Sequence, residues 1–171
     1  MRFLSVILIC AASAAAQTAS NPVVNTSKTF YGMVKNDVLR TAEKIPDDLY
    51  SFQPTPEVRT IGQLIGHIAD GQYEFCSPVT GKPVSKDIEK NVKGKTALVA
   101  ALKDAFAYCD SVYANLTDAD AVSTVSMFGQ KMAKIGVLDF NTAHTNEHYG
   151  NLVTYMRLKG IVPPSSEPAK K

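Results

Sequence analysis

Histidine is the residue type in this sequence whose number and spacing most directly suggest chemistry. The chain has three histidines, His67, His144 and His148, and the last two form a His-x-x-x-His pair. On a helix such a pair lies on one face, one turn apart, so both imidazoles can bind one metal ion from the same side. A helix pairing that brings His67 opposite would complete three neutral imidazole ligands with one open coordination position, as in catalytic metal sites. The alternative, an ordinary packed or surface pair of histidines, stays open at this point.

Polar side chains near the histidines in the sequence are candidates to assist such a site. They are Asp70, Glu74, Asn141 and Asn151. Each could hydrogen-bond a ligand imidazole or act as an acid or base near bound water. The simpler alternative for each is a solvated polar position on a helix. The expected cofactor is one divalent ion, but imidazole suits zinc, nickel and ferrous iron alike, so the histidines alone do not select the metal.

The elements that must position these residues are predicted to be helices. Apolar residues at helical spacing predict helices over about 26–44, 60–77 and 96–116, and a fourth that starts between 131 and 139 and ends at 159–160. Thr60, with Gln63 three residues later, has the pattern of a capping box. The proline-containing stretch 46–59 is expected to connect without a helix of its own, and no segment has a convincing strand pattern. The predicted fold class is therefore all-α, a four-helix bundle.

The connection between the second and third helices indicates the topology. The stretch 77–95 is much longer than antiparallel neighbours need, and fully extended it could run the whole length of a bundle helix. It therefore predicts a long crossover, with helices 2 and 3 pointing the same way. Cys76 and Cys109 would then lie toward the same end of the bundle, either as one disulfide or as two buried thiols.

The N-terminus has the pattern of an export signal. A short positive start is followed by an apolar run over 3–9, and Ala14-Ala15-Ala16 stands before Gln17 as a signal-peptidase site would. An uncleaved anchor is the alternative, although the apolar run is short for a bilayer span. We predict a signal peptide over 1–16, a disordered mature N-terminus over 17–25, one domain over 26–164 and a disordered tail over 165–171. The mature protein would be periplasmic or secreted after cleavage near Ala16.

The charge of the mature chain bears on its partners. Without Arg2, 17 of the 18 basic side chains remain against 16 acidic ones, so the domain is nearly neutral. This argues against a nucleic-acid footprint, and no later segment is long and apolar enough to span a membrane. The expected partner is a small-molecule substrate of unknown identity, and a homodimer remains open.

Two stretches of the chain carry a family resemblance. One is residues 52–69, FQPTPEVRTIGQLIGHIA, and the other is residues 144–164, which contain HTNEHYGNL and YMRLKGIVPP. In this order and at this separation they resemble the hallmarks of the DinB-like superfamily of metal-binding four-helix bundles, over nearly the whole mature chain. The family pattern has one histidine in the second helix and two in the fourth, all on one divalent ion. The resemblance thus implies that His67, His144 and His148 bind the metal.

The resemblance leaves the reaction open between two function classes. The first is an exported metal-dependent hydrolase or transferase acting on a small molecule, because characterised relatives include thiol-dependent transferases and an isomerase. The export signal argues against a thiol reaction, since the thiol cofactors of those relatives are mainly cytosolic. The second class is a metal-binding or stress-associated bundle without turnover. A polar pocket beside an open metal position would favour the first class, and a sealed site the second.

Overall fold

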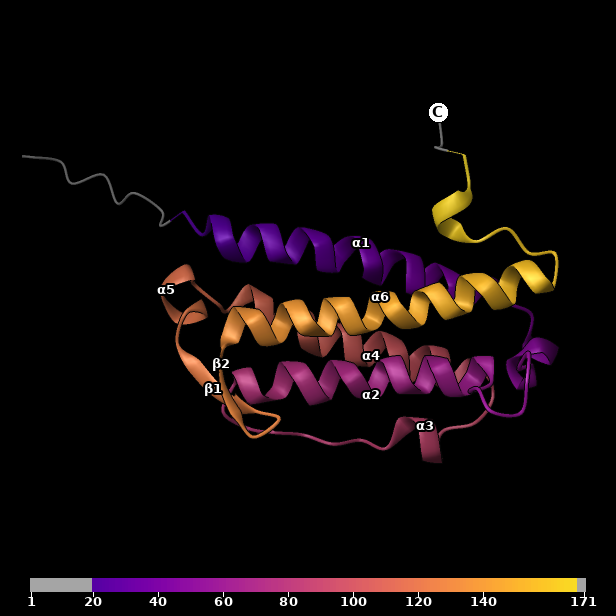
Figure 1. Ribbon diagram of the computed structural model, residues 1–171, viewed down its shortest axis with the longest axis horizontal. Coiled ribbons are helices and arrows are strands. Elements are labelled where there is room, and N and C mark those ends of the chain that lie inside the picture. The colour runs from indigo at the N-terminus through magenta and orange to yellow at the C-terminus, as the bar shows by residue number, and fades with distance from the viewer. Residues whose placement is uncertain (1–19, 169–171) are drawn as a thin grey trace, which may run out of the picture.

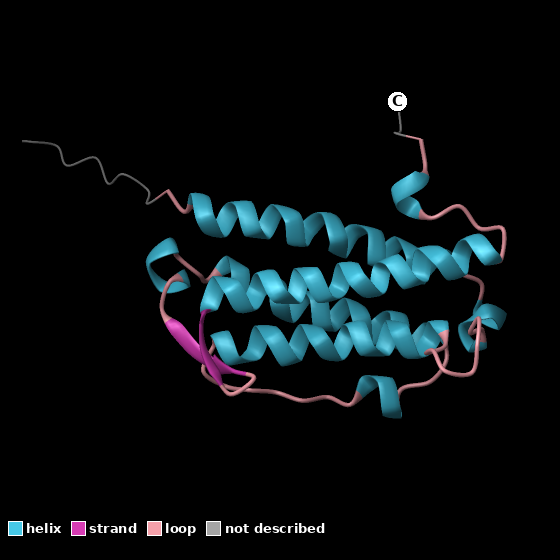
Figure 2. Ribbon diagram, viewed as in Figure 1, coloured by secondary structure: helices cyan, strands magenta, loops and turns pink. Residues whose placement is uncertain are grey.

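Four long helices pack side by side along one axis in the computed structural model, which describes residues 20–168 (Figures 1 and 2). They are α1 (Pro22–Lys44), α2 (Ile61–Val79), α4 (Lys95–Ala114) and α6 (Lys134–Leu158). The core is one continuous cluster of apolar side chains from all four. The predicted all-α four-helix bundle is confirmed. None of the described helices is long and apolar enough to cross a membrane.

The helices run in two parallel pairs. In Figure 1, α1 and α6 run in one direction, and α2 and α4 run in the other. A long connection therefore returns along the bundle from the end of α2 to the start of α4, and it contains one helical turn, α3 (Ile88–Asn91). The predicted crossover is confirmed. The connection between α1 and α2 was predicted to contain no helix, but it contains a short 3-10 helix, η1 (Asp47–Ser51).

Helix α2 is central to the bundle and begins at the predicted capping box. The Thr60 hydroxyl accepts the backbone N–H of Gln63 at 3.2 Å, and the Gln63 side chain accepts the backbone N–H of Thr60 at 2.8 Å. These bonds satisfy two of the free N–H groups at the helix start. Because α2 packs against both α4 and α6, most of its surface is buried. Its register fixes where His67 faces.

A β-hairpin precedes α6, which the sequence analysis did not predict. Strands β1 (Thr124–Met127) and β2 (Gln130–Ala133) pair antiparallel, after a short helix α5 (Asp118–Ala121). Phe128 and Gly129 link them with φ of 52° and 72°, the positive angles of a tight two-residue hairpin turn. Within β1, Met127 is the one buried residue. The expectation of no strand was wrong because a hairpin this short gives almost no alternating pattern.

The N-terminal boundary of the bundle also differs from prediction. Helix α1 begins at Pro22 rather than at residue 26, so residues 22–25 are helical and not disordered. The Asp118 carboxylate accepts the backbone N–H groups of Val23 at 3.1 Å and Val24 at 2.9 Å. A side chain remote in sequence therefore caps this helix. The residues next to the helix start do not predict such a cap. The predicted signal peptide, 1–16, lies outside the described residues.

The C-terminal segment is ordered further than predicted. A 3-10 turn, η2 (Pro164–Ser166), places Ser165 against the Tyr149 hydroxyl at 2.8 Å. Glu167 forms ion pairs with Arg40 and with Lys44 of α1. The tail predicted over 165–171 is thus held against the bundle through residue 167, because its partners lie on α1 and α6. Residues 169–171 lie outside the described part of the chain.

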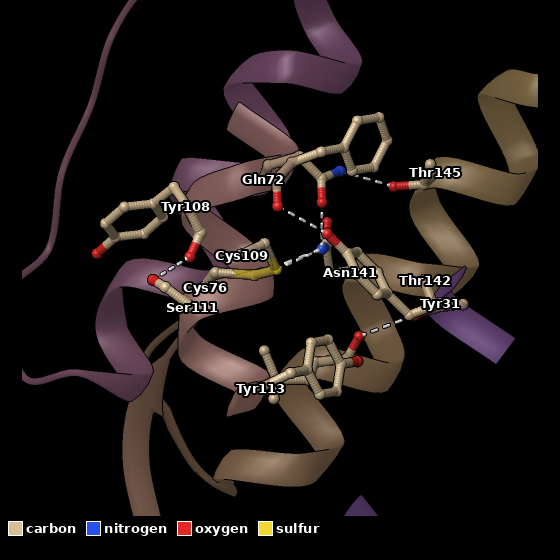
Figure 3. Close-up of a disulfide and its surroundings, with 12 residues drawn as sticks. Tyr31, Gln72, Cys76, Tyr108, Cys109, Ser111, Tyr113, Asn141, Thr142 and Thr145 are labelled. Atoms are coloured by element: carbon tan, nitrogen blue, oxygen red, sulfur yellow. Dashed lines mark hydrogen bonds between the residues drawn. A yellow bond between two sulfur atoms is a disulfide. The ribbon is translucent and has the colours of Figure 1, made fainter. Parts of the chain in front are cut away.

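Cys76 of α2 and Cys109 of α4 form a disulfide in the bundle core, with Cα atoms 5.4 Å apart (Figure 3). The parallel direction of α2 and α4 brings both cysteines to one level of the bundle. The bond links residues 33 apart in sequence, and constraint of an unfolded loop of that size is worth about 3–4 kcal/mol in the chain-entropy account. It therefore ties the two helices that the crossover connects.

Candidate metal centre

The three histidines lie together between α2 and α6. Nε2 of His144 is 3.1 Å from Nε2 of His67 and 3.1 Å from Nε2 of His148. All three ligand atoms lie within 4.8 Å of one another. Zinc–nitrogen bonds of about 2.0–2.1 Å in a tetrahedral site place neighbouring ligand nitrogens about 3.3–3.4 Å apart. The two spacings to His144 are close to that value, so the three atoms could hold one small divalent ion.

Helix geometry and one glycine place the His144 ring. His144 and His148 stand one turn apart on α6 and face α2. A Cβ added at Gly71 of α2 would lie 3.0 Å from Cε1 and 3.1 Å from Nδ1 of His144. These distances are tighter than ordinary packing contacts, so a larger residue would push against the ring. Gly71 therefore allows the imidazole of α6 to approach α2 closely.

Glu89, in the crossover turn α3, hydrogen-bonds one of the three rings. Its Oε2 atom is 3.0 Å from Nδ1 of His67. An ionised carboxylate can only accept, so Nδ1 carries the proton and donates. Nε2 of His67 then keeps its lone pair toward the other histidines. Nδ1 of His144 and Nδ1 of His148 are buried and have no hydrogen-bond partner among residues 20–168.

The electrostatic environment favours neutral imidazoles. Burial, together with smaller contributions from the neighbouring His148 and His67, lowers the pKa of His144 to about 4. Burial also lowers the pKa of His148, again with a contribution from His67. Both groups are therefore uncharged near pH 7, which is the form that binds metals.

The metal-free protein should lose stability as the pH falls from about 6.5 to about 4. The folded state holds the His144 proton more weakly than the unfolded state does. The unfolded state therefore binds more protons in this window, and the free energy of unfolding decreases with falling pH. Urea unfolding in a chelator at several pH values measures this. His144→Gln, which cannot titrate, should show a shallower dependence, and an identical slope in both proteins would contradict the assignment.

The residues predicted to assist the site take different places. The Asp70 carboxylate accepts the backbone N–H groups of Ile88 at 2.7 Å and Glu89 at 2.9 Å, so it holds α3 rather than a histidine ring. Glu74 is exposed on α2. Asp70 is therefore a partner of the crossover, and Glu74 makes no contact that ties it to the histidines.

The two asparagines that were predicted to assist the site lie in different parts of the structure. Asn141 is fully buried beside the disulfide, where its Nδ2 donates to Gln72 at 2.8 Å and lies 3.6 Å from both sulfur atoms (Figure 3). It belongs to the core and does not bond a histidine ring. Asn151 is exposed and lines the same pocket as His148. Of the four candidates, Asn151 is thus the one that shares a cavity with the histidine cluster.

Sequence reasoning missed Glu89. The residue lies 22 positions from His67, in a connection with no helix predicted in it. Neither helical spacing nor proximity in sequence could relate it to the histidines. The available signal was weak: Ile88, one of three aliphatic residues in the crossover with Val84 and Val92, stands beside an acidic residue. Ile88 is the most buried of the three, and Val84 and Val92 also pack against the core.

A polar pocket of about 670 Å³ opens beside His148. Its lining includes Gln53, Arg59, Glu89, Glu147, His148 and Asn151. Nε of Arg59 donates to Oε1 of Glu89 at 2.8 Å, so the Glu89 carboxylate contacts both His67 and the Arg59 guanidinium. A larger groove of about 850 Å³ lies between α1 and α6 and is lined by none of the three histidines. Of these two cavities, the smaller one adjoins the histidine cluster.

The architecture and the histidine cluster define a class of protein: a four-helix bundle with a candidate metal centre between its second and last long helices. A family model for the DinB superfamily matches residues 33–152. The chain therefore belongs to the DinB superfamily, as its resemblance implied.

The chain is also similar to individual proteins in sequence or in fold. The chain is 26% identical over 129 residues to the uncharacterized protein YjoA of Bacillus subtilis (strain 168), covering 74% of this chain and 84% of that protein. Among solved structures, it is similar to a DinB-like protein from Bacillus cereus ATCC 10987, with a TM-score of 0.70, 20% identity, and 82% and 93% of the two chains covered. It is also similar to a mycothiol-dependent maleylpyruvate isomerase, with a TM-score of 0.65, 16% identity, and 75% and 60% covered. At these identities the solved structures support the fold alone.

Proposed function

We propose that this protein binds one divalent metal ion through Nε2 of His67, His144 and His148. We further propose that it is a metal-dependent hydrolase or transferase acting on a small molecule. The observation that carries the proposal is that Nε2 of His144 lies 3.1 Å from Nε2 of His67 and from Nε2 of His148, a spacing that suits a tetrahedral ion. Three protein ligands leave one position for a substrate or water, which is the arrangement of catalytic sites.

The residues around the cluster suit a reaction on a small polar molecule. A divalent ion with an open position supplies a Lewis acid that lowers the pKa of water or polarises a carbonyl. Arg59 gives the adjoining pocket a cation that can hold an anionic group of a substrate, while Asn151 and Gln53 offer amide hydrogen bonds. The pocket adjoins His148 directly. A thiol-dependent transfer is a variant of this proposal, since one structural neighbour is a mycothiol-dependent isomerase.

We also propose that the protein acts after export and removal of residues 1–16. The apolar run over 3–9 and the Ala14-Ala15-Ala16 sequence support this. The Cys76–Cys109 disulfide supports it independently, because disulfides persist mainly in oxidising compartments.

A non-catalytic metal-binding bundle is the second candidate. The observation that favours it is that Asp70 and Asn141, two of the groups expected to assist chemistry, are engaged in holding the fold. The pocket beside His148 favours the catalytic proposal instead, since storage or sensing of an ion needs no substrate cavity.

Metal analysis of the exported protein tests the proposal. Protein purified without chelator should hold one divalent ion per chain, and the metal-free form should take up zinc, nickel or ferrous iron in a one-to-one titration. The loaded protein should then be screened for ester hydrolysis and for thiol-adduct formation. Turnover that depends on metal supports the enzyme, and stoichiometric metal without turnover on either panel supports the second candidate. Failure to bind any of the three ions would contradict both the catalytic and the non-catalytic candidate.

A further inference from the structure

The crossover between α2 and α4 reaches the histidine cluster at one residue, Glu89. Resting on the proposed function, we infer that Glu89 is a positioning residue that fixes the ring and tautomer of His67 for metal binding. We further infer that the turn α3 serves to hold this carboxylate in place. The turn α3 lies outside α2 and α6, the two helices that carry the histidines.

Both oxygens of the Glu89 carboxylate have charged or polar partners. Oε2 accepts the Nδ1 proton of His67 at 3.0 Å, and Oε1 accepts the Nε proton of Arg59 at 2.8 Å. The side chain is about three-quarters buried, with 27% exposed. A carboxylate held at both ends has little rotational freedom, so it offers His67 an acceptor in one fixed direction.

The backbone of Glu89 is fixed as closely as its side chain. The Asp70 carboxylate caps α3 by accepting the N–H groups of Ile88 and Glu89. Ile88 is buried against the bundle, and a Cβ added at Gly66 would lie 2.6 Å from Cα and 2.9 Å from N of Glu89. Gly66 directly precedes His67 on α2. The turn α3 therefore sits on the helix surface next to the histidine that it contacts.

This arrangement has a direct consequence for the metal centre. A histidine that donates one N–H to a carboxylate keeps its other nitrogen as a lone pair and becomes a better ligand. His67 has such a partner, whereas Nδ1 of His144 and of His148 is unpaired within the described region. Glu89 thus orients one of the three ligand rings, that of His67, and loss of such a partner typically weakens metal affinity about 10–100-fold.

Substitutions at Glu89 test the inference by metal affinity and by a spectroscopic signature. Glu89→Gln keeps the shape and a neutral acceptor, whereas Glu89→Leu removes the acceptor. Affinity for zinc, measured by competition with a chromophoric chelator, should fall in the order wild type, Glu89→Gln, Glu89→Leu, with a total loss of about 10–100-fold. The visible spectrum of the cobalt-loaded protein should change in the same order, which a loss of fold stability alone would not produce.

Glu74→Gln is the matched control, because Glu74 is an exposed acidic residue on α2, the helix that carries His67, and forms no hydrogen bond to any ring. It should keep wild-type affinity and spectrum. If wild type binds metal and both Glu89 variants match it, the inference fails and the proposed function stands. If Glu89→Leu does not fold, the Glu89→Gln result decides. A wild-type protein that binds no metal overturns the proposed function and this inference together.

Discussion

Replacing His144 with alanine is expected to abolish metal binding and any activity that depends on it. Nε2 of His144 is the atom that lies 3.1 Å from both other ligand nitrogens, so its removal breaks the cluster at its centre. Two remaining imidazoles on different helices would hold a labile ion poorly. The loss should exceed the roughly 10–100-fold that removing a partner behind a ligand costs. Metal content after dialysis and a zinc titration measure it, and His148→Ala should behave alike.

The state of the fold in these variants decides what kind of site this is. The apolar cluster from four helices supplies most of the stability, so helical content and cooperative melting should survive the loss of one imidazole. Collapse without metal would instead mark a structural ion, as in domains that fold only when loaded. Asn146→Ala is the control, because Asn146 is exposed on α6 in the groove away from the histidines. Unchanged metal content in both histidine variants would show that these residues are not the ligands.

The parts of the fold that the sequence predicted are those with local signals. The Thr60–Gln63 capping box acts within one helical turn, and the stretch 77–95 shows by its length alone that it is not a tight turn. The start of α1 could not be found this way, because its cap is the Asp118 carboxylate on another element. The ordered tail depends in the same way on Glu167 contacting α1. Contacts between remote segments set these boundaries, and a single sequence does not display them.

The candidate site likewise has residues that the sequence could indicate and a contact that it could not. His67, His144 and His148 could be singled out because their residue type is rare in this chain and their placement matched helices and a family pattern. Proximity in sequence also selected Asp70, whose carboxylate accepts backbone N–H groups of the crossover turn and not of a histidine ring. The residue that hydrogen-bonds the His67 ring is Glu89, whose backbone N–H donates to the Asp70 carboxylate. Helical spacing relates residues on one helix, whereas this contact joins a helix to a crossover.

Replacing Gly66 with alanine is expected to disrupt the metal centre without touching a ligand or Glu89 itself. The new methyl group would lie 2.6 Å from Cα of Glu89, a backbone atom that cannot rotate aside. The turn α3 must therefore move away from α2, which breaks the Asp70 cap and the bond from Glu89 to His67. Overpacking of this kind costs about 1–3 kcal/mol. Zinc affinity should fall to about the level of Glu89→Leu.

The control and a double variant separate displacement of Glu89 from general damage to the helix. Gly150→Ala makes the same substitution on α6, where no atom lies within 4 Å of the added Cβ. It should leave zinc affinity unchanged and raise stability by up to about 1 kcal/mol through helix propensity. If Gly66→Ala acts only by moving Glu89, adding Glu89→Leu to it should cost no further affinity, because two changes that remove one contact are not additive. Additive losses would mean that alanine at position 66 displaces His67 directly, and the crossover would then not be the route of its effect.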